Sequence, residues 1–489
     1  MLTKQLINAC QKYNDQVALI SAEDSPAKNC PAESPEQSGN PITYRQLLEK
    51  SYFLRDYLAG KTGSPQIGIL LPNSPEFVIS FLAIRLLGKT PVPINYLLSR
   101  PEIEHIITEA NLDTVLTSAY FKKLLNNIPN PVYLDFLHAS SPAQTTGLIK
   151  PDPDSSQFKT DGLATILYTS GTSGLPKGVM LSDANILSNI KSFSQAMPLT
   201  SEHTILGILP YFHAFGLTCA LLYPLLTGGT IVLVKKFNPA QLGELITKHD
   251  IRCLLTVPSI YRAMLRLPPN SLKNVQLCIS GGEALPAEVW KEFHRHFNLS
   301  IYEGYGLTET APVISLNTPT HLKPGSVGKP LPEVQVRIRP DNEIWVKGAN
   351  VMCGYYRQPQ LTSEIITSDG WFKTGDLGYL DNHGFLFISG RKKEMIISAG
   401  ENIFPAEIEK VLSEHPAIAE CAVIGIPDKI RGEIPKAFVV LKENIAAGPE
   451  EIKCFCQGKI AHYKIPGRVE FLRELPRSPT GKILKKELS

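Results

Sequence analysis

The sequence predicts an α/β protein. We expect a large N-terminal domain of helix-covered, mostly parallel sheets with a small antiparallel β piece, followed by a small, mobile α+β C-terminal domain. Short apolar runs alternate with helical patterns through most of the chain, which is typical of parallel sheets covered by helices. Short strand-like runs without helices between them precede Gly390, and a charged joint, "GRKKEMI", then leads into a separate run of helix and strands.

The first half of the chain supplies the strands and helices of the parallel sheets. The run "QIGILLP" at 66–72 predicts a buried strand, and "SPEFVISFLAIRLLG" at 74–88 predicts a capped amphipathic helix that ends at glycine. Residues 23–41, rich in Ser, Pro, Glu and Asn, predict a mobile surface loop. Further apolar runs that predict strands lie at 114–118, 163–167, 229–234, 253–258 and 276–283.

The change of pattern near Gly390 predicts two domains, residues 1–390 and residues 391–489. Upstream of it, "EIWVKGANVMCGYY" and "GFLFISG" predict short antiparallel strands. Downstream, "ENIFPAEIEKVLSEHP" predicts a helix with Pro405 near its start, and "IAECAVIGIPD" and "KAFVVLK" predict strands.

Composition and charge argue against several classes of protein. The 489 residues are 43% hydrophobic and 19% charged with a net charge of +3, which fits a globular protein with a large core rather than a dedicated nucleic-acid binder. The nine cysteines include no Cys-x-x-Cys pair, so neither a disulfide framework nor a zinc site is expected. The polar N-terminal segment is unlike a signal peptide, and we expect a cytoplasmic protein.

A segment without Asp, Glu, Lys or Arg runs from 204 to 234 and is long enough to span a bilayer. Pro210, Pro224 and the pair Gly228-Gly229 interrupt it. We therefore expect strand, helix, turn and strand in a buried core, with at most peripheral contact with a membrane.

The stretch "YTSGTSGLPKG" at 168–178 predicts either a phosphate-binding loop or an ordinary glycine-rich loop. Its hydroxyls and glycines cannot build a core, yet it lies between an apolar run and a helix that Ser182 could cap. The register of Lys177 excludes a Walker A loop, and the pattern is not a nucleophile elbow. What remains is a loop of hydroxyls and amides with one lysine, able to donate hydrogen bonds to phosphates.

Two further motifs carry acidic side chains among glycines. In "IYEGYGLTETAP", two glycines allow close backbone approach, Tyr305 can stack on a flat ligand, and Thr308 and Glu309 offer a hydroxyl and a carboxylate. A carboxylate near phosphates usually reaches them through Mg²⁺. In "WFKTGDLGYL", Asp376 fits a pair of ribose hydroxyls or is an ordinary turn residue.

Two basic motifs follow, Arg391 in "GRKK" and Lys482 in "RSPTGKILKKEL". Seen alone, Lys482 is an ordinary solvated lysine near the end of the chain. Each motif by itself is a weak indication, whereas all of them in this order and spacing are a specific one.

With these motifs the chain resembles the adenylate-forming superfamily, which comprises acyl-CoA synthetases, firefly luciferases and the adenylation domains of peptide synthetases. The resemblance covers nearly the whole chain. It is strongest to bacterial medium- and long-chain fatty acyl-CoA ligases, through "GYGLTETAPVISLN" and the run from "DGWFKTGDLG" to "GRKKEMIISAGENIFPAEIE". The fatty-acyl signature usually has His where Lys373 stands and Asp where Gly390 stands. "PVPINYLL" and "APVISLNTPTHLKPGSVG" are also similar to acyl-carrier-protein synthetases.

The resemblance implies that ATP, Mg²⁺ and CoA take part. A fatty acid would react with ATP to give acyl-adenylate and pyrophosphate, and transfer to the thiol of CoA would give acyl-CoA and AMP. Three alternatives stay open: a synthetase that loads acyl-carrier protein, an aryl- or other carboxylate–CoA ligase, and a binding protein with a decayed site. No nucleic-acid partner is implied.

The resemblance also implies roles for the phosphate and adenine motifs. The loop that would hold the β- and γ-phosphates consists of Thr169, Ser170, Gly171, Thr172, Ser173, Gly174 and Lys177. The adenine pocket would be lined by Gly281, Gly282, Glu283, Gly304, Tyr305 and Gly306.

Around the reacting atoms, the resemblance implies that Glu309 binds Mg²⁺ and that Thr308 contacts the α-phosphate. Asp376 and Arg391 would hold the ribose. Lys482 would bridge the attacking carboxylate and the α-phosphate.

His213, in "PYFHAFG", would stand near the acyl carboxylate unless it is a satisfied buried histidine. The fatty acid would lie in an apolar tunnel behind it, where small residues leave room for a chain: Ala214, Gly216 and Cys219. Lys393 matches the family's hinge between the domains, and Gly400 matches the position that lines the pantetheine channel.

Overall fold

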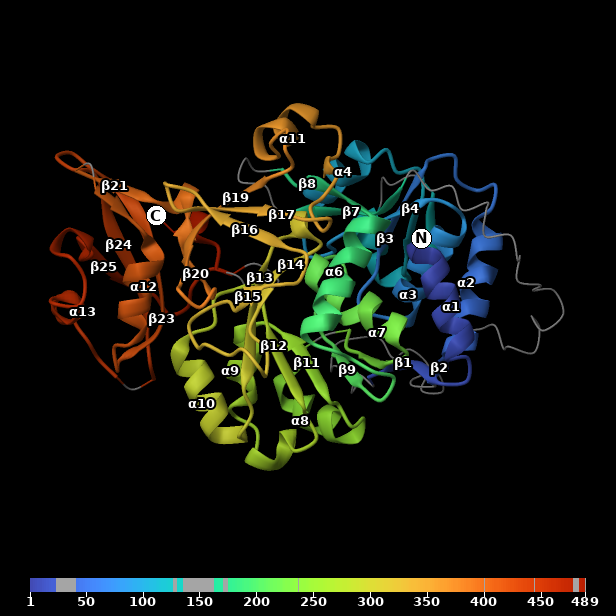
Figure 1. Cartoon of the computed structure of the whole chain (residues 1–489), viewed down its shortest axis with the longest axis horizontal. Helices are drawn as coiled ribbons and strands as arrows, with labels where there is room; N and C mark the ends of the chain where they lie inside the picture. The colour runs from blue at the N-terminus through green and yellow to red at the C-terminus, as the bar shows by residue number, and fades with distance from the viewer. Residues whose placement is uncertain are drawn as a thin grey trace.

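The structure is a computed structural model of the chain. It describes residues 1–22, 41–125, 130–134, 162–169, 175–235, 237–399, 401–443, 445–477 and 483–488. The predicted loop at 23–41 falls almost wholly outside them. Figure 1 shows a large body at the right and a smaller one at the left. We call residues 1–391 the large lobe and residues 396–488 the small lobe.

The central sheet of the large lobe has six parallel strands in the order β13-β12-β11-β9-β10-β1. Their bounds are β1 (Val17–Ser21), β9 (Thr204–Gly207), β10 (Thr230–Leu233), β11 (Cys253–Thr256), β12 (Leu277–Ser280) and β13 (Ile301–Gly306). Antiparallel strands extend both edges: β2 (Ile42–Thr43), β14 (Val313–Leu316) and β15 (Lys329–Pro330). The apolar runs therefore predicted β9, β10, β11 and β12 of this sheet, whereas β1 and β13 were not predicted.

A second parallel sheet has the order β4-β3-β5-β6. Its strands are β3 (Gln66–Leu70), β4 (Thr90–Pro93), β5 (Val115–Thr117) and β6 (Pro131–Tyr133). Helix α3 (Pro75–Leu86) follows β3 and is capped by Ser74, whose hydroxyl accepts from the backbone N–H of Phe77. Every residue of α3 is buried, including Glu76 and Arg85, so the expected amphipathic helix has no solvent-exposed polar face and packs inside the lobe.

A third sheet joins the hairpin of β7 (Leu163–Thr169) and β8 (Lys177–Ser182) to β18 (Gly354–Tyr355). Strand β8 was not predicted, because its short run lies between glycines and a helix cap. Ser182 caps α6 (Asp183–Ala196) through the backbone N–H of Asn185, as expected. The hydroxyl-rich stretch therefore connects two antiparallel strands rather than a strand and a helix.

The predicted antiparallel piece is a sheet in the order β16-β17-β19-β20, next to the small lobe. Its strands are β16 (Gln335–Ile338), β17 (Glu343–Lys347), β19 (Phe372–Leu380) and β20 (Leu386–Arg391). Its last strand leads through a short turn, Lys392–Glu394, into the small lobe.

The small lobe is an α+β unit, as predicted. Its sheet has the order β22-β21-β24-β23, with β25 parallel to β24. The elements are β21 (Ile396–Ser398), β22 (Glu401–Ile403), α12 (Pro405–Ser413), β23 (Ile418–Asp428), β24 (Gly432–Leu441), α13 (Pro449–Cys456) and β25 (Arg468–Phe471). Pro405 takes the first position of α12, where its missing N–H costs no hydrogen bond.

The remaining helices cover the sheets of the large lobe (Figure 1). They are α1 (Leu2–Lys12), α2 (Tyr44–Leu58), α4 (Arg100–Glu109), α8 (Pro239–Lys248), α9 (Pro258–Met264), α10 (Ala287–Phe297) and α11 (Pro359–Ile365).

The uncharged segment 204–234 folds as expected, into β9, a helical stretch, a glycine turn and β10. The helical stretch begins as a π-helix, η4 (Phe215–Leu222), and continues as α7 (Tyr223–Thr227). Within the described part of the chain, no helix combines the length and the apolar character needed to cross a bilayer.

Candidate active site

The cleft of the molecule opens where the order of the central sheet reverses. From β9 the chain goes to β10 on one side, whereas β11 lies on the other side of β9. Ligands of open α/β sheets bind at the carboxyl ends of the strands at such a reversal. The segment after β9 carries His213 and the segment after β11 carries Val257, and both line the cleft.

The structure brings most of the predicted site residues to this cleft. Those that line it are Thr169, Lys177, His213, Gly281, Gly282, Glu283, Gly304, Tyr305, Gly306, Thr308, Glu309, Asp376, Arg391 and Lys393. The others lie outside the described residues: Ser170, Gly171, Thr172, Ser173, Gly174, Gly400 and Lys482.

Asp376 is a buried acid of the cleft and is only 3% exposed. It lies within strand β19, opposite Arg391 of β20, so the alternative of a turn residue is wrong. Its Oδ1 pairs with Nε of Arg391 at 2.9 Å, and its Oδ2 accepts from the hydroxyl of Tyr305 at 2.6 Å. Tyr305, predicted only to stack on a ligand, therefore also orients this carboxylate.

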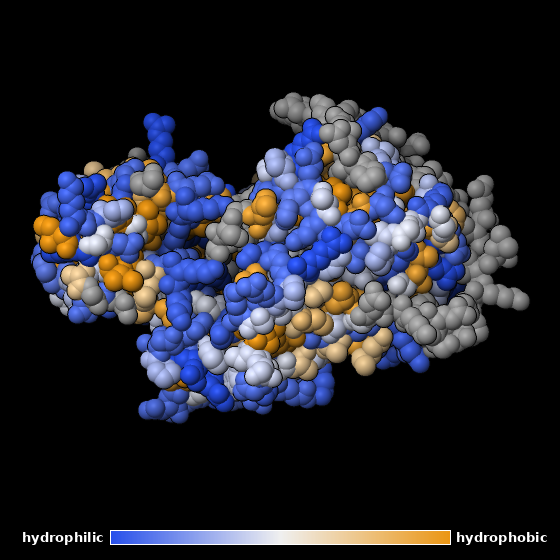
Figure 2. All heavy atoms as spheres, turned by 90° about the horizontal axis from the view of Figure 1, so that it is seen from above, coloured by the Kyte–Doolittle hydropathy of each residue, from blue (hydrophilic) through white to orange (hydrophobic). Residues whose placement is uncertain are grey.

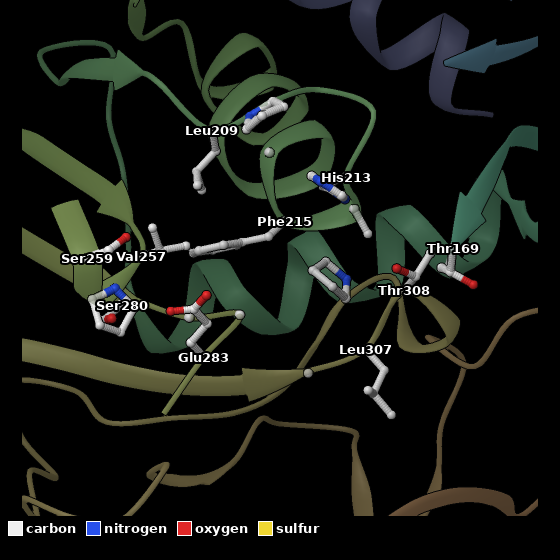
Figure 3. Close-up of a pocket in the computed structure, with 18 of the residues that line it drawn as sticks. Thr169, Leu209, His213, Phe215, Val257, Ser259, Ser280, Glu283, Leu307 and Thr308 are labelled. Atoms are coloured by element: carbon white, nitrogen blue, oxygen red, sulfur yellow. The ribbon is translucent and has the colours of Figure 1, made fainter. Parts of the chain in front are cut away.

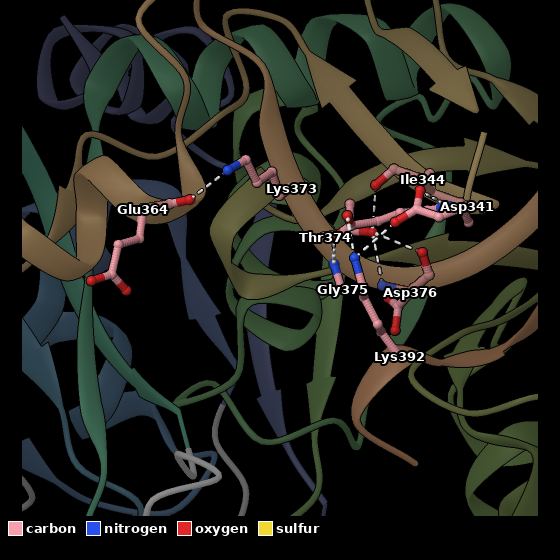
Figure 4. Close-up of polar contacts among 9 residues, drawn as sticks. Asp341, Ile344, Glu364, Lys373, Thr374, Gly375, Asp376 and Lys392 are labelled. Atoms are coloured by element: carbon pink, nitrogen blue, oxygen red, sulfur yellow. Dashed lines mark hydrogen bonds and ion pairs between the residues drawn. The ribbon is translucent and has the colours of Figure 1, made fainter. Parts of the chain in front are cut away.

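Hydrogen bonds also fix the backbone beside Asp376 (Figure 4). The hydroxyl of Thr374 accepts from the N–H of Asp376 at 3.0 Å and donates to the carbonyl of Ile344 at 2.7 Å. Burial alone would lower the pKa of Arg391, but the carboxylates of Asp376 and Glu394 raise it above its ordinary value. The Asp376–Arg391 pair is therefore a fixed, charged unit at one end of the cleft.

Lys373, which replaces the usual histidine, points away from this pair in Figure 4 and donates to the backbone carbonyl of Glu364 at 2.9 Å. Lys392 forms ion pairs with Asp341 at 2.8 Å and Glu343 at 3.2 Å, which fixes the start of the turn between the lobes.

Glu309 sits in a short helical turn, Thr308–Thr310, after β13. Its Oε1 accepts from the hydroxyl of Tyr355 at 2.8 Å. Because β18 pairs with β8, Tyr355 lies beside the hairpin of β7 and β8, and the ammonium of Lys177 is 5.8 Å from its ring centroid. Tyr355 was not predicted as a site residue, since its run "GYY" indicated only a strand.

The acidic side chains at this point fit a magnesium ion that is bound together with phosphates. Among the residues that the structure describes, no group of three or more His, Cys, Asp or Glu could hold a metal by itself. Mg²⁺ commonly takes one or two carboxylates and completes its shell with phosphates and water. Glu309, oriented by Tyr355, is such a carboxylate.

Gly306 shows why the motif needs glycine here. A Cβ at this position would lie 2.0 Å from the carbonyl oxygen of Pro312, so any side chain would separate β13 from the turn that carries Glu309. At Gly281, a Cβ would lie 3.3 Å from the ring of Phe215, which fills the space beside it.

His213 lines the same cleft, and Figure 3 shows it on the side where Phe215 also lies. Its Nε2 is buried and has no hydrogen-bond partner among the described residues. Burial lowers the pKa of His213 to about 4, so the imidazole is neutral. Leu209, Phe215 and Val257 line the cleft here. The alternative of a satisfied buried histidine is therefore wrong.

Two of the small residues predicted to make room for an acyl chain do not do so. A Cβ on Gly216 would lie 2.3 Å from the carbonyl oxygen of Pro210, so backbone already occupies that space. Cys219 is 1% exposed and belongs to the core. Of the three, Ala214 lines the cleft as expected, and so does Gly216 through its backbone.

Glu303 is a buried acid that the motif analysis did not single out. It lies on β13, lines the cleft, and accepts from the backbone N–H of Leu285 at 2.8 Å. Burial raises its pKa to about 8, against the smaller opposing effect of that hydrogen bond. The sequence feature that could have indicated Glu303 is that it is the single acid in the run "IYEGYG".

Comparison with known families decides what this arrangement is. The family model described as AMP-binding enzyme matches residues 6–356, and the model described as AMP-binding enzyme C-terminal domain matches residues 407–482. The chain belongs to the AMP-binding enzyme family.

Curated relatives of this AMP-binding enzyme include ligases for dissimilar acids. A long-chain-fatty-acid–CoA ligase of Bacillus subtilis is 34% identical over 92% of this chain and 90% of its own length. A sulfoacetate–CoA ligase of Cupriavidus necator is 32% identical over 97% of both chains. This AMP-binding enzyme is therefore an adenylate-forming acid–thiol ligase. Its relatives act on different acids and do not identify its substrate.

Among solved structures, the AMP-binding enzyme is similar to o-succinylbenzoate coenzyme A synthetase from Bacillus subtilis, determined in complex with ATP and magnesium ion. The TM-score is 0.85 at 31% identity, covering 99% of this chain and 98% of that one. The superposition confirms the predicted fold and includes both lobes.

Proposed function

We propose that this AMP-binding enzyme is a fatty acid–CoA ligase. It would activate a medium- or long-chain fatty acid with ATP, forming acyl-adenylate and pyrophosphate. It would then transfer the acyl group to the thiol of CoA, releasing AMP.

The observation that carries this proposal is the apolar wall around His213, formed by Leu209, Phe215 and Val257. A hydrocarbon chain buried against it would gain about 0.8 kcal/mol per methylene. A sulfonate or a second carboxylate would instead need a cation. The nearby Arg262 lines the cleft but already binds Glu420 of the small lobe.

In the first step, a carboxylate oxygen of the acid attacks the α-phosphorus of ATP, and the bond to pyrophosphate breaks. Both reactants are anions, so positioning and charge neutralisation supply most of the catalysis. We assign the ribose to Asp376 and Arg391, the outer phosphates to Thr169 and Lys177, and the magnesium ion, which offsets phosphate charge when bound, to Glu309.

Neutral His213 would donate a hydrogen bond from Nε2 to the carboxylate. The imidazole would stay uncharged at pH 7 while it does so. In the second step the thiol attacks the acyl carbonyl and AMP leaves. We keep the assignment of Lys482 to the first step and Gly400 to the second, with Lys393 at the joint, as part of this proposal.

A panel of acids scored for pyrophosphate release tests the substrate. It should hold saturated fatty acids of increasing length, sulfoacetate, 2-succinylbenzoate and ferulate. We expect the rate at low substrate concentration to rise steeply with chain length until the pocket is filled. A flat profile, or a preference for an aromatic acid, would contradict the proposal. Running the second step with CoA and with acyl-carrier protein then identifies the acceptor.

A matched pair of variants ties the result to the apolar wall. Val257→Ser should lower the rate with long acids more than with acetate, because the long chain loses apolar contact that acetate never makes. Val469→Ser changes an equally half-buried valine in the small lobe and should leave the length profile unchanged.

A further inference from the structure

The two lobes are joined by a carboxylate that binds two arginines. Oε1 of Glu420, at the start of β23 in the small lobe, lies 3.2 Å from Nη1 of Arg262 in the large lobe. The same oxygen lies 2.7 Å from Nη2 of Arg477 in the small lobe. Arg262 also donates to the carbonyl of Ala419 at 3.2 Å. Glu420 therefore links a group on each side of the junction.

Arg477 stands at the base of the loop that contains Lys482. That loop, 478–482, lies outside the described residues, but both of its ends are described. Arg477 pairs with Ile483 in an antiparallel bridge, and the N–H of Leu484 donates to the carbonyl of Pro476 at 2.8 Å. These contacts join Arg477 to the segment that begins at Ile483, so whatever holds Arg477 also holds that segment.

The far side of the same base is tied to the joint between the lobes. Lys485 forms ion pairs with Glu394, in the turn that connects the lobes, at 3.1 Å and with Glu409 of α12 at 2.8 Å. Residues 483–487 line the cleft together with Glu420. Residues 483–487 are thus held at the cleft from two directions.

We propose that Glu420 is a positioning residue for adenylate formation. By binding Arg262 and Arg477 with one oxygen, it couples the orientation of the small lobe to the placement of residues 483–487, which line the cleft. The kinetic test of this inference rests on the proposed function. A second test, the distance between the lobes, rests only on the geometry of the junction.

The strength of the contact suits a link that must open between the two steps. The side chains of Arg262 and Glu420 are 40% and 28% exposed, so water screens the pair. A second contact between the lobes, Lys442 to Glu288 at 3.3 Å, is also exposed. In Figure 2 the junction between the lobes is covered mainly by hydrophilic side chains. Such a junction can be released without exposing a large apolar surface.

The kinetic test separates the two steps. Glu420→Gln keeps the size of the side chain and removes its charge. We expect pyrophosphate release to fall about two- to five-fold, the range of partly exposed ion pairs, with thioester formation from supplied acyl-adenylate unchanged. Arg262→Met should have the same split effect, and Arg262→Lys, which keeps the charge, should restore most of the rate.

Matched controls remove a charge without touching the junction. Glu450→Gln breaks a 2.8 Å ion pair with Lys453 inside the small lobe, and Lys191→Met breaks a 2.6 Å pair with Glu333 inside the large lobe. Neither should change either step. Equal losses in both steps for Glu420→Gln would overturn the positioning role.

A distance measurement makes the test independent of activity. Cys353 in the large lobe and Cys454 in the small lobe are both exposed and free, so spin labels on them, in a Cys30→Ser background, report the orientation of the lobes. We expect Glu420→Gln to broaden the distance distribution, and an unchanged distribution would overturn the inference. If the parent chain released no pyrophosphate with any acid, the proposed function would fail, and this distance measurement would still decide the role of Glu420.

Discussion

At one end of the cleft Asp376 is fixed by Tyr305 and Arg391, whereas at the other end the Nε2 of His213 has no partner among the described residues. The first end is charged and already hydrogen-bonded before any ligand arrives. The second is apolar and leaves one polar atom to be satisfied. The contrast teaches that the nucleotide end is built for one constant ligand, and that the acyl end is built around a single hydrogen bond and shape.

Asp376→Asn should have the largest effect on the difference between the two ends of the cleft. The change keeps the shape but removes the charge that faces Arg391, so we expect ATP-dependent pyrophosphate release to fall about 1,000-fold, as for other paired buried charges. Kinetics at saturating fatty acid, with ATP varied, check this. Asp369→Asn, in an exposed turn, is the control and should retain full activity. A loss confined to the fatty-acid KM would contradict the assignment.

Glu309→Gln tests the metal at the centre of the cleft. The amide keeps a hydrogen-bond acceptor for Tyr355 but lacks the charge that attracts Mg²⁺. We expect about a 100-fold loss of activity with the fold intact, and a shift of the magnesium dependence to higher concentration. Glu333→Gln removes an exposed carboxylate and should change neither. Parent-level turnover in the variant, or in EDTA, would refute this role of Glu309.

The acyl end is tested by His213→Gln, which keeps a hydrogen-bond donor but cannot titrate. Because burial lowers the pKa of His213 to about 4, the unfolded state binds a proton between pH 6.5 and 4 and the folded state does not. The parent chain should therefore lose stability as pH falls through this window, and the variant should lose about 1–3 kcal/mol less. Urea unfolding at pH 7 and pH 5 measures this difference.

His294→Gln, on the exposed face of α10, is the matched control and should leave the pH dependence of unfolding unchanged. The same slope in the parent chain and in His213→Gln would show that His213 is not held neutral by a dry pocket. The shape of the activity profile between pH 6 and 8 should also be the same in both proteins.

For Glu303 we expect a pH dependence of stability with the opposite sign to that of His213. Its pKa is raised to about 8, so the folded state keeps a proton that the unfolded state loses above pH 4.5, and stability falls as pH rises through this window. Glu303→Gln should therefore be more stable than the parent chain at pH 8 by about 3–4 kcal/mol, with the gap narrowing to about 1 kcal/mol at pH 5. Thermal unfolding at both pH values checks it, and a constant gap would contradict the shifted pKa.

Much of the fold and of the nucleotide end could be predicted because the information is local. Apolar runs identified several strands of both parallel sheets, and short motifs placed Asp376, Arg391, Thr308 and Glu309 in one cleft. The contacts that orient them could not be read from the chain. Tyr305 is 71 residues from Asp376, so their hydrogen bond depends on which sheets lie side by side.

The acyl end was predicted least well, because packing decides it. The glycine at Gly216 was expected to leave space, but the carbonyl of Pro210 fills it. Helix α3 was expected to have a polar face, yet it is buried all round because other elements cover it. Strand β8 is too short to show a clear alternation. In each case the local pattern was correct for an isolated element, and the neighbours changed its meaning.

The pairing of β1 with β10 has a consequence for synthesis. Leu19 of β1 lies opposite Ile231 of β10, so an inner strand of the central sheet is made early and its parallel neighbour some two hundred residues later. At about 5–20 residues per second, the ribosome takes about 10–40 s to deliver that partner. Through this interval a nascent apolar strand has an open edge, which is the condition under which chaperones are needed and premature release favours aggregation.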